Sequence, residues 1–174
     1  GGSELSTEGA NANGLDIEYA TAWSYGIEET PNLLIPNYNG GSSNGSLGEK
    51  SAMWQLLRQA GQNPKQICQN LPLYWGPQPF TAGPMYMGAI GIFLFILGMC
   101  VLKGREKWWL FASCVLAILL GWGRNFMWFT QLWFDYAPFY SKFRTVSMAI
   151  VTVQFCMPLL GIYALDRIIK EDIP

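Results

Sequence analysis

The distribution of apolar residues divides the chain into two unlike parts. Residues 1–65 are mostly polar, whereas almost everything after Leu71 is apolar. Three apolar stretches approach the length of about 20 residues that a helix needs to cross a bilayer: 84–102, 108–126 and 145–165. The second stretch reaches this length only if Arg124 extends its charge to the membrane interface. This pattern predicts an all-α membrane protein with about three transmembrane helices and an outer region of short helices and irregular loops.

The alternative is a soluble protein in which the same three stretches form core helices. Composition favours the membrane, because 51% of the residues are hydrophobic, 15% are aromatic and only 13% are charged. Soluble domains carry roughly 25% charged residues. Trp and Tyr also flank the apolar stretches, as they do at membrane interfaces. The net charge of −1 indicates no binding of nucleic acid.

Two residue types limit the chemistry. The chain has no histidine, which is the commonest general base and metal ligand. Its four cysteines are isolated from one another, without the spacing of a zinc or redox site. We therefore expect no metal and no cofactor, and any proton transfer would fall to carboxylates.

The short loop at 103–107 predicts the orientation. It contains Lys103, Arg105 and Lys107 next to the ends of two apolar stretches, which is typical of a cytoplasmic loop. Residues 1–83 and the loop at 124–144 would then lie outside the cytoplasm. The tail at 166–174 would lie inside. Because the sequence starts at Gly1, we expect a fragment whose remaining helices pack against this part.

The outer region contains local structure of its own. Residues 47–61 have the spacing of an amphipathic helix, and 63–70 predicts one further helical turn that starts at Asn63 and Pro64. Residues 71–84 contain four prolines and two glycines, which predicts a rigid non-helical approach to the membrane. We expect no β-structure beyond a short hairpin at 30–46.

The predicted outer loop carries three positively charged residues, although Lys and Arg are usually concentrated in cytoplasmic loops. Arg144, Lys142 and Arg124 lie outside, among aromatic residues that include Tyr136 and Tyr140. Arginine binds phosphate with a planar fork and lysine with a point charge, so these cations suit a lipid phosphate. Alternatively, Lys142 and Arg144 anchor the third helix at the lipid headgroups, and the two tyrosines belong to the interfacial aromatic belt.

Three carboxylates are candidates for acid–base chemistry: Glu29, Asp135 and Glu28. Asp135 stands alone between Phe134 and Tyr136, a setting that favours a perturbed pKa. Glu28 and Glu29 precede Pro31, and they can also be read as a solvated helix end. Trp23 and Tyr25 in the outer region join the two loop tyrosines as aromatics that could stack on a sugar or lie at the interface.

Several segments resemble a known family. The segment at 3–41, the stretch "YWGPQPFTAGPMYMGAI" (74–90) and the stretch "FYSKFRTVSM" (139–148) are similar to bacterial YfhO-type membrane proteins in their Bacteroidetes form. Arg144 matches the family's Phe-Arg position, and Glu28 and Glu29 fall in its "SYGxxET" segment. The chain departs from the pattern in "GIEETPN", where the family has a small residue before the Glu-Thr pair and no proline directly after it, so Glu29 is a better match than Glu28.

The resemblance implies a large polytopic protein related to the GT-C glycosyltransferases. This fragment would come from the middle of the chain, and the family's catalytic carboxylate would lie in an earlier outer loop. The implied activity is transfer of a sugar from a polyprenyl phosphate to an envelope glycan or lipid on the outer face. The alternative is a non-catalytic protein that binds, flips or scaffolds lipid-linked glycans.

Overall fold

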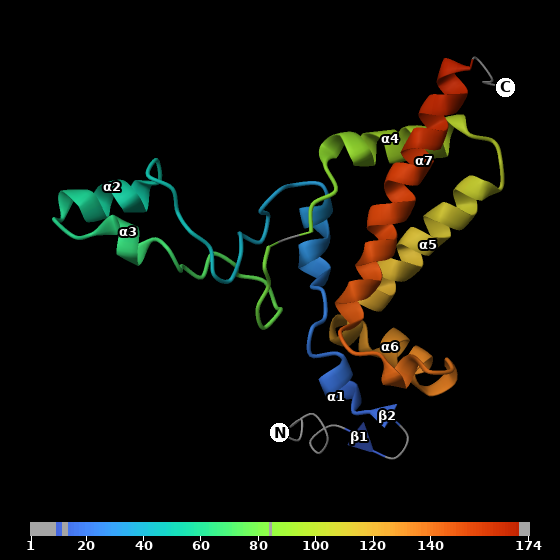
Figure 1. Ribbon diagram of the computed structural model, residues 1–174. Coiled ribbons are helices and arrows are strands. Elements are labelled where there is room, and N and C mark those ends of the chain that lie inside the picture. Colours follow the sequence, from blue (N-terminus) through green and yellow to red (C-terminus); the bar gives the residue numbers. More distant parts are fainter. Residues whose placement is uncertain (1–9, 12–13, 84, 171–174) are drawn as a thin grey trace, which may run out of the picture.

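The structure is a computed structural model, and it describes residues 10–11, 14–83 and 85–170. These residues are mainly helical (Figure 1). The α-helices are α1 (Ile17–Ala20), α2 (Ala52–Gln59), α3 (Pro64–Ile67), α4 (Ala89–Val101), α5 (Glu106–Gly121), α6 (Met127–Tyr136) and α7 (Val151–Ile169). Four 3-10 helices accompany them: η2 (Ile27–Leu33), η3 (Gly123–Phe126), η4 (Tyr140–Lys142) and η5 (Val146–Ile150). Strands β1 (Ala10–Asn11) and β2 (Gly14–Leu15) form an antiparallel pair.

One helix among the described residues is long and apolar enough to cross a membrane. It is the 24-residue helix Val146–Ile169, which joins η5 to α7. Helices α5 and α6 meet the same criteria only when taken together, and they are bent by 104°. Helix α4 is apolar but has 13 residues. The expectation of a helical protein is thus confirmed, and one helix is a candidate to cross a membrane, while the count of about three spans is not confirmed.

Helices α4 and α7 pack against each other through glycines. A Cβ atom on Gly161 of α7 would lie 2.8 Å from the Leu94 Cβ of α4. A Cβ on Gly98 of α4 would lie 3.0 Å from the side chain of Leu160 on α7. The missing side chains let the two backbones approach closely, as is common between helices in membranes.

Helix α5 completes the bundle by packing along α7, as Figure 1 shows. Its last residue, Gly121, faces Ile150, where a Cβ would lie 2.7 Å from Cγ1. The fully buried residues Ile150, Val153, Leu160 and Ala164 form the centre of the core. Helix α7 continues as one helix through Pro158.

The bundle has two ends, which we name after their loops. At the 103–107 end, α4 finishes and α5 begins. At the 124–144 end, α5 finishes and η5 leads into α7. The segment at 19–25 lies across the 124–144 end: Tyr25 N donates to Gly121 O at 2.8 Å, and Ser147 N donates to Trp23 O at 3.2 Å.

Helices α2 and α3 form an arm that projects from the rest of the molecule (Figure 1). Both fall inside the predicted helical ranges, and Ser51 Oγ caps α2 by accepting from Trp54 N at 3.3 Å. Pro64 occupies the start of α3, as predicted, although the predicted cap Asn63 makes no side-chain capping bond there. Neither helix contains a buried residue.

Three local predictions need correction. The 124–144 loop is largely helical, because α6 occupies Met127–Tyr136. The predicted span at 108–126 ends at Gly121, and Gly123 adopts a left-handed φ of +47° where the chain turns. The hairpin forms at 10–15 and not at 30–46, where Gly40 and Gly45 instead make isolated bridges to Tyr74 and Leu71. Pro84, the first residue of the predicted first span, lies outside the described residues, as do residues 171–174 of the predicted tail.

Candidate functional site

Arg144 lies against two aromatic rings at the 124–144 end. Its guanidinium carbon is 4.9 Å from the ring centroid of Tyr19 and 5.2 Å from that of Trp23. Tyr19 is in α1, Trp23 follows in the turn after the helix, and both rings face Arg144. Such contacts stabilise an exposed arginine by about 0.5–1 kcal/mol. Stacking uses the face of the guanidinium, and the N–H donors at its edge remain suitably directed for an anion.

The backbone of the same segment also holds the side chain of Arg124. Its Nε and Nη2 atoms donate to the carbonyl oxygens of Thr21 and Ala22, each at 3.3 Å. The backbone N–H of Arg124 donates to Ser24 Oγ at 2.8 Å. The side chain lines a cavity of about 350 Å³ together with Glu18, Thr21 and Met127. This cavity contains one cation and one carboxylate.

The 19–24 segment thus brings together residues that are far apart in the sequence. Two predicted phosphate ligands, Arg124 and Arg144, contact it from the two ends of the 124–144 loop, and the predicted aromatic Trp23 belongs to it. The third predicted cation, Lys142, has an exposed side chain in η4. These contacts form a cationic and aromatic surface, which we call the Arg124–Arg144 surface.

Glu29 lies in a different environment. It is 1% exposed, and its carboxylate accepts hydrogen bonds from three donors. Tyr74 Oη donates to Oε1, while Gly26 N at 2.7 Å and Gln78 Nε2 at 3.1 Å donate to Oε2. The carboxylate therefore joins the 26–33 turn to the 74–78 turn. A carboxylate engaged in this way stabilises the local fold, and proton abstraction from an acceptor would disrupt these bonds.

Two tyrosines surround this carboxylate. Tyr25 Oη donates to the Glu29 carbonyl oxygen at 2.8 Å. Burial, and secondarily the negative charge of Glu29, raises the pKa of Tyr25 well above its usual value. Burial and the hydrogen bond to Glu29 likewise raise the pKa of Tyr74. Tyr25 and Glu29 line a cavity of about 160 Å³ with Gln78, Thr81 and Ser147 among its other walls.

The remaining predicted residues lie apart from this network. Glu28 and Asp135 are exposed, and Tyr136 on α6 is 83% exposed. Tyr140 packs against Trp133, with ring centroids 6.3 Å apart, and burial raises the pKa of its hydroxyl. The Tyr140 hydroxyl and the Trp133 indole N–H are buried without a hydrogen-bond partner among the described residues.

Sequence reasoning missed four residues that build these sites: Tyr19, Tyr74, Gln78 and Thr21. The four-residue spacing of Tyr19 and Trp23 would place both rings on one face only within a helix, and α1 ends at Ala20, so this spacing gave no clear signal. The partners of Glu29 had no local signal, since Tyr74 and Gln78 are separated from it by 45 and 49 residues.

Comparisons with family models, with curated proteins and with solved structures find no match to this chain.

Proposed function

We propose that this chain is part of a polytopic inner-membrane protein of the YfhO type, related to the GT-C glycosyltransferases. The protein transfers a sugar from a polyprenyl phosphate to an envelope glycan or lipid on the outer face. In this proposal residues 1–83 and 124–144 are extracytoplasmic and 103–107 is cytoplasmic. The observation that carries it is the Arg124–Arg144 surface, where two guanidinium groups and two aromatic rings gather at one end of the bundle.

The chemistry of a lipid-linked sugar fits such a surface. Its phosphate is both the recognition element and the leaving group, so a transferase needs cations that hold the negative charge as it develops. Guanidinium groups offer two parallel N–H donors to a phosphate. Aromatic faces such as that of Trp23 can contact a sugar ring or the first isoprene units.

Transfer also needs a carboxylate that activates the acceptor hydroxyl. Glu29 is assigned a structural role, because three donors already occupy its oxygens. Asp135 and Glu28 are exposed and stay candidates on this chain. By the resemblance to GT-C proteins, the catalytic carboxylate belongs to an earlier outer loop of the whole protein.

The second candidate function is non-catalytic binding, flipping or scaffolding of a lipid-linked glycan by the whole protein. It is favoured by the fixed hydrogen bonding of Glu29, the best family match among the three carboxylates. This function needs the Arg124–Arg144 surface and no general base.

The test compares Arg144→Lys and Arg144→Ala in the full-length protein. If Arg144 binds a phosphate, Lys loses nearly as much polyprenyl-phosphate binding as Ala, because the two-pronged geometry is lost. The expected loss for Ala is about tenfold to a hundredfold. Lys65→Gln is the control, since it removes one exposed charge from α3 in the arm, away from the Arg124–Arg144 surface, and should leave binding unchanged. Full binding in Arg144→Lys contradicts the phosphate site and leaves a headgroup anchor.

A separate measurement distinguishes transfer from binding. Envelope glycan modification is assayed in cells that carry each variant, next to polyprenyl-phosphate binding by the purified protein. Parallel loss of both in Arg144→Ala supports the transferase. Loss of binding without any change in the glycans supports the second function.

The proposed orientation is tested by cysteine labelling of intact cells. Single cysteines at Ser43 and Ser141 should react with an impermeant thiol reagent, and one at Gly104 should not. These variants are made after replacement of the four native cysteines, of which Cys100 is exposed. The reverse pattern contradicts the orientation and with it the outer-face site.

A further inference from the structure

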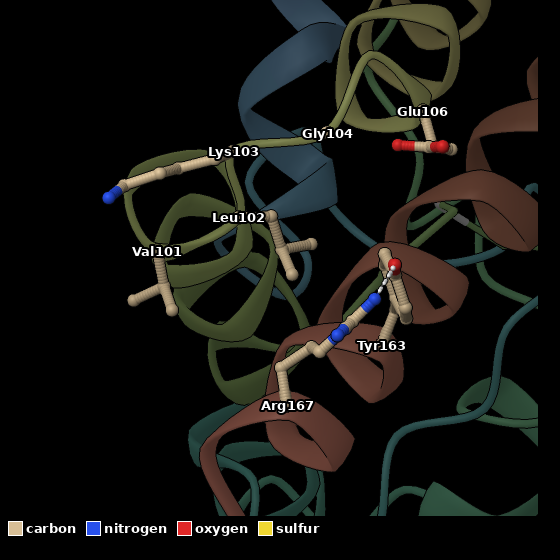
Figure 2. A pocket seen from close by; sticks show the side chains of 7 residues that line it. All are labelled: Val101, Leu102, Lys103, Gly104, Glu106, Tyr163 and Arg167. Carbon is tan, nitrogen blue, oxygen red and sulfur yellow. Dashed lines mark hydrogen bonds between the residues drawn. The ribbon is translucent and has the colours of Figure 1, made fainter. Parts of the chain in front are cut away.

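A cavity of about 240 Å³ lies at the 103–107 end of the bundle, opposite the Arg124–Arg144 surface (Figure 2). Val101 and Leu102, where α4 ends, supply apolar walls. Gly104 and Glu106 border it from the loop and the start of α5, and Tyr163 and Arg167 come from α7. The cavity therefore combines an apolar side with charged groups of both signs.

Arg167 is held in place by Tyr163. Its Nη2 donates to the Tyr163 hydroxyl oxygen at 3.0 Å, and its guanidinium carbon is 5.4 Å from the ring centroid. The two residues are one helical turn apart, so α7 fixes both. Because the hydroxyl oxygen accepts from Arg167, its own O–H can donate to a further group. Guanidinium and hydroxyl donors together suit a phosphate oxygen.

Glu106 lies on the other side of the cavity from Arg167, as Figure 2 shows. It is in the first turn of α5, where a negative charge is favourable. Lys103 also borders the cavity, but its side chain extends outward, away from Tyr163. The cavity therefore presents the Arg167 guanidinium and the Glu106 carboxylate to a ligand. A zwitterion, which carries one charge of each sign, matches this pair.

The surrounding side chains place the cavity at the level of lipid headgroups. Trp108 and Trp109, at the start of α5, are 59% and 75% exposed. Lys107 Nζ donates to Met99 O at 2.8 Å and lies 5.6 Å from the Trp108 ring centroid. Exposed tryptophans next to lysine and arginine mark the boundary between the hydrocarbon core and the headgroups.

We propose that this cavity binds the headgroup of a phosphatidylethanolamine-type phospholipid. The phosphate contacts Arg167 and Tyr163, and the primary ammonium group contacts Glu106. Glu106 disfavours phosphatidylglycerol, which has no positive group to place beside the carboxylate. Phosphatidylcholine carries the charge but no N–H donor. The inference is independent of sugar transfer and requires only that the bundle lies in a bilayer.

The test measures lipid retention by native mass spectrometry on the full chain, purified and delipidated in detergent. Phosphatidylethanolamine, phosphatidylglycerol and phosphatidylcholine with the same acyl chains are added at equal concentrations. We expect phosphatidylethanolamine to be retained about tenfold more than either of the others, the usual effect of one charge-assisted hydrogen bond. Equal retention of all three, or a preference for phosphatidylglycerol, overturns the proposal.

Variants separate the two halves of the headgroup. Arg167→Gln and Tyr163→Phe should weaken retention of all three lipids, because all contain the phosphate. Glu106→Gln should remove only the preference for phosphatidylethanolamine. The matched controls are Lys170→Gln and Asp166→Asn, an exposed ion pair at 2.9 Å at the C-terminal end of α7 that does not line the cavity, and they should leave retention unchanged.

Thermal unfolding of each variant shows whether the fold is intact. A preference for phosphatidylethanolamine that persists in folded Glu106→Gln overturns the assignment of Glu106. Retention by folded Arg167→Gln at the unaltered level overturns the phosphate contact.

Discussion

The α4–α7 contact and the α2–α3 arm differ sharply, although the sequence predicts helices in both. In the first, Gly98 and Gly161 bring two backbones together, and Leu160 is completely buried. In the second, α2 has a clear apolar face, but its Leu56 is 65% exposed. Apolar periodicity therefore predicts that a helix forms, and it does not tell whether that helix has a partner within the same chain.

The largest effect is expected from filling the α4–α7 contact. Gly161→Leu places a side chain where a Cβ alone would lie 2.8 Å from Leu94, so the helices must separate. Overpacking of this kind costs about 1–3 kcal/mol or more of unfolding free energy. Thermal unfolding in detergent measures the loss. Gly91→Leu on α4 is the control, because a Cβ there meets no atom within 4 Å. Equal effects of the two changes would show that α4 and α7 do not pack as described.

The Glu29 network joins two loops and should rank next. Glu29→Gln removes the charge and turns one acceptor into a donor, which leaves the Tyr74 hydroxyl or the Gln78 amide without its acceptor. A buried polar group left unpaired costs about 1–3 kcal/mol. Glu28→Gln, one residue earlier and exposed, should change the unfolding free energy little. A catalytic Glu29 would instead lose activity in Glu29→Gln with its stability unchanged.

The buried hydroxyl of Tyr25 predicts a dependence of stability on alkaline pH. Its folded-state pKa is raised above that of an unfolded tyrosine, which is about 10. The stabilisation is complete below that value and is lost as pH rises, because the unfolded chain ionises first. By pH 11 the loss should reach about 1 kcal/mol. Chemical unfolding at pH 9 and pH 11 measures it, and Tyr25→Phe should reduce the difference between the two. Identical pH dependence in both proteins would contradict the burial of this hydroxyl.

The smallest effect is expected in the arm. Leu56→Ser on α2 should change the unfolding free energy by less than about 0.5 kcal/mol, because the side chain already contacts solvent. The same measurement on the full-length protein sharpens the comparison. A larger loss there would show that another part of that protein covers the apolar face of α2.

Local patterns in the sequence predicted most of the helices. Helices α2 and α3 fall inside the predicted ranges, with Pro64 at the predicted start of α3. Helix α4 falls inside 84–102, and α7 runs to Ile169, four residues beyond the predicted end of the third apolar stretch. Helix α6 was missed because its apolar residues form two short triplets, separated by Thr130 and Gln131, and not one continuous run. The chain changes direction at Gly123, which has a left-handed φ. The sequence alone does not distinguish such a glycine from the other glycines of an apolar stretch.

The sites depended on contacts over long distances in the chain. Charge and residue type singled out Arg124 and Arg144, but nothing local placed them against the 19–24 segment. For Glu29, the match to a family segment indicated importance without a role. Its role follows from Tyr74 and Gln78, which only the folded chain brings to it.

The 104° bend between α5 and α6 has a consequence for how deeply the bundle would sit in a bilayer. Helix α5 has 16 residues and extends for about 24 Å. Because of the bend, α6 runs across the direction of α5 and does not lengthen the bundle along it. In the proposed membrane setting, α6 therefore lies along the bilayer surface at the 124–144 end, and its exposed Trp128 and Tyr136 suit the headgroup level. A helix that lies along the interface fixes how deeply this end of the bundle sits in the bilayer, independently of any ligand that the protein binds.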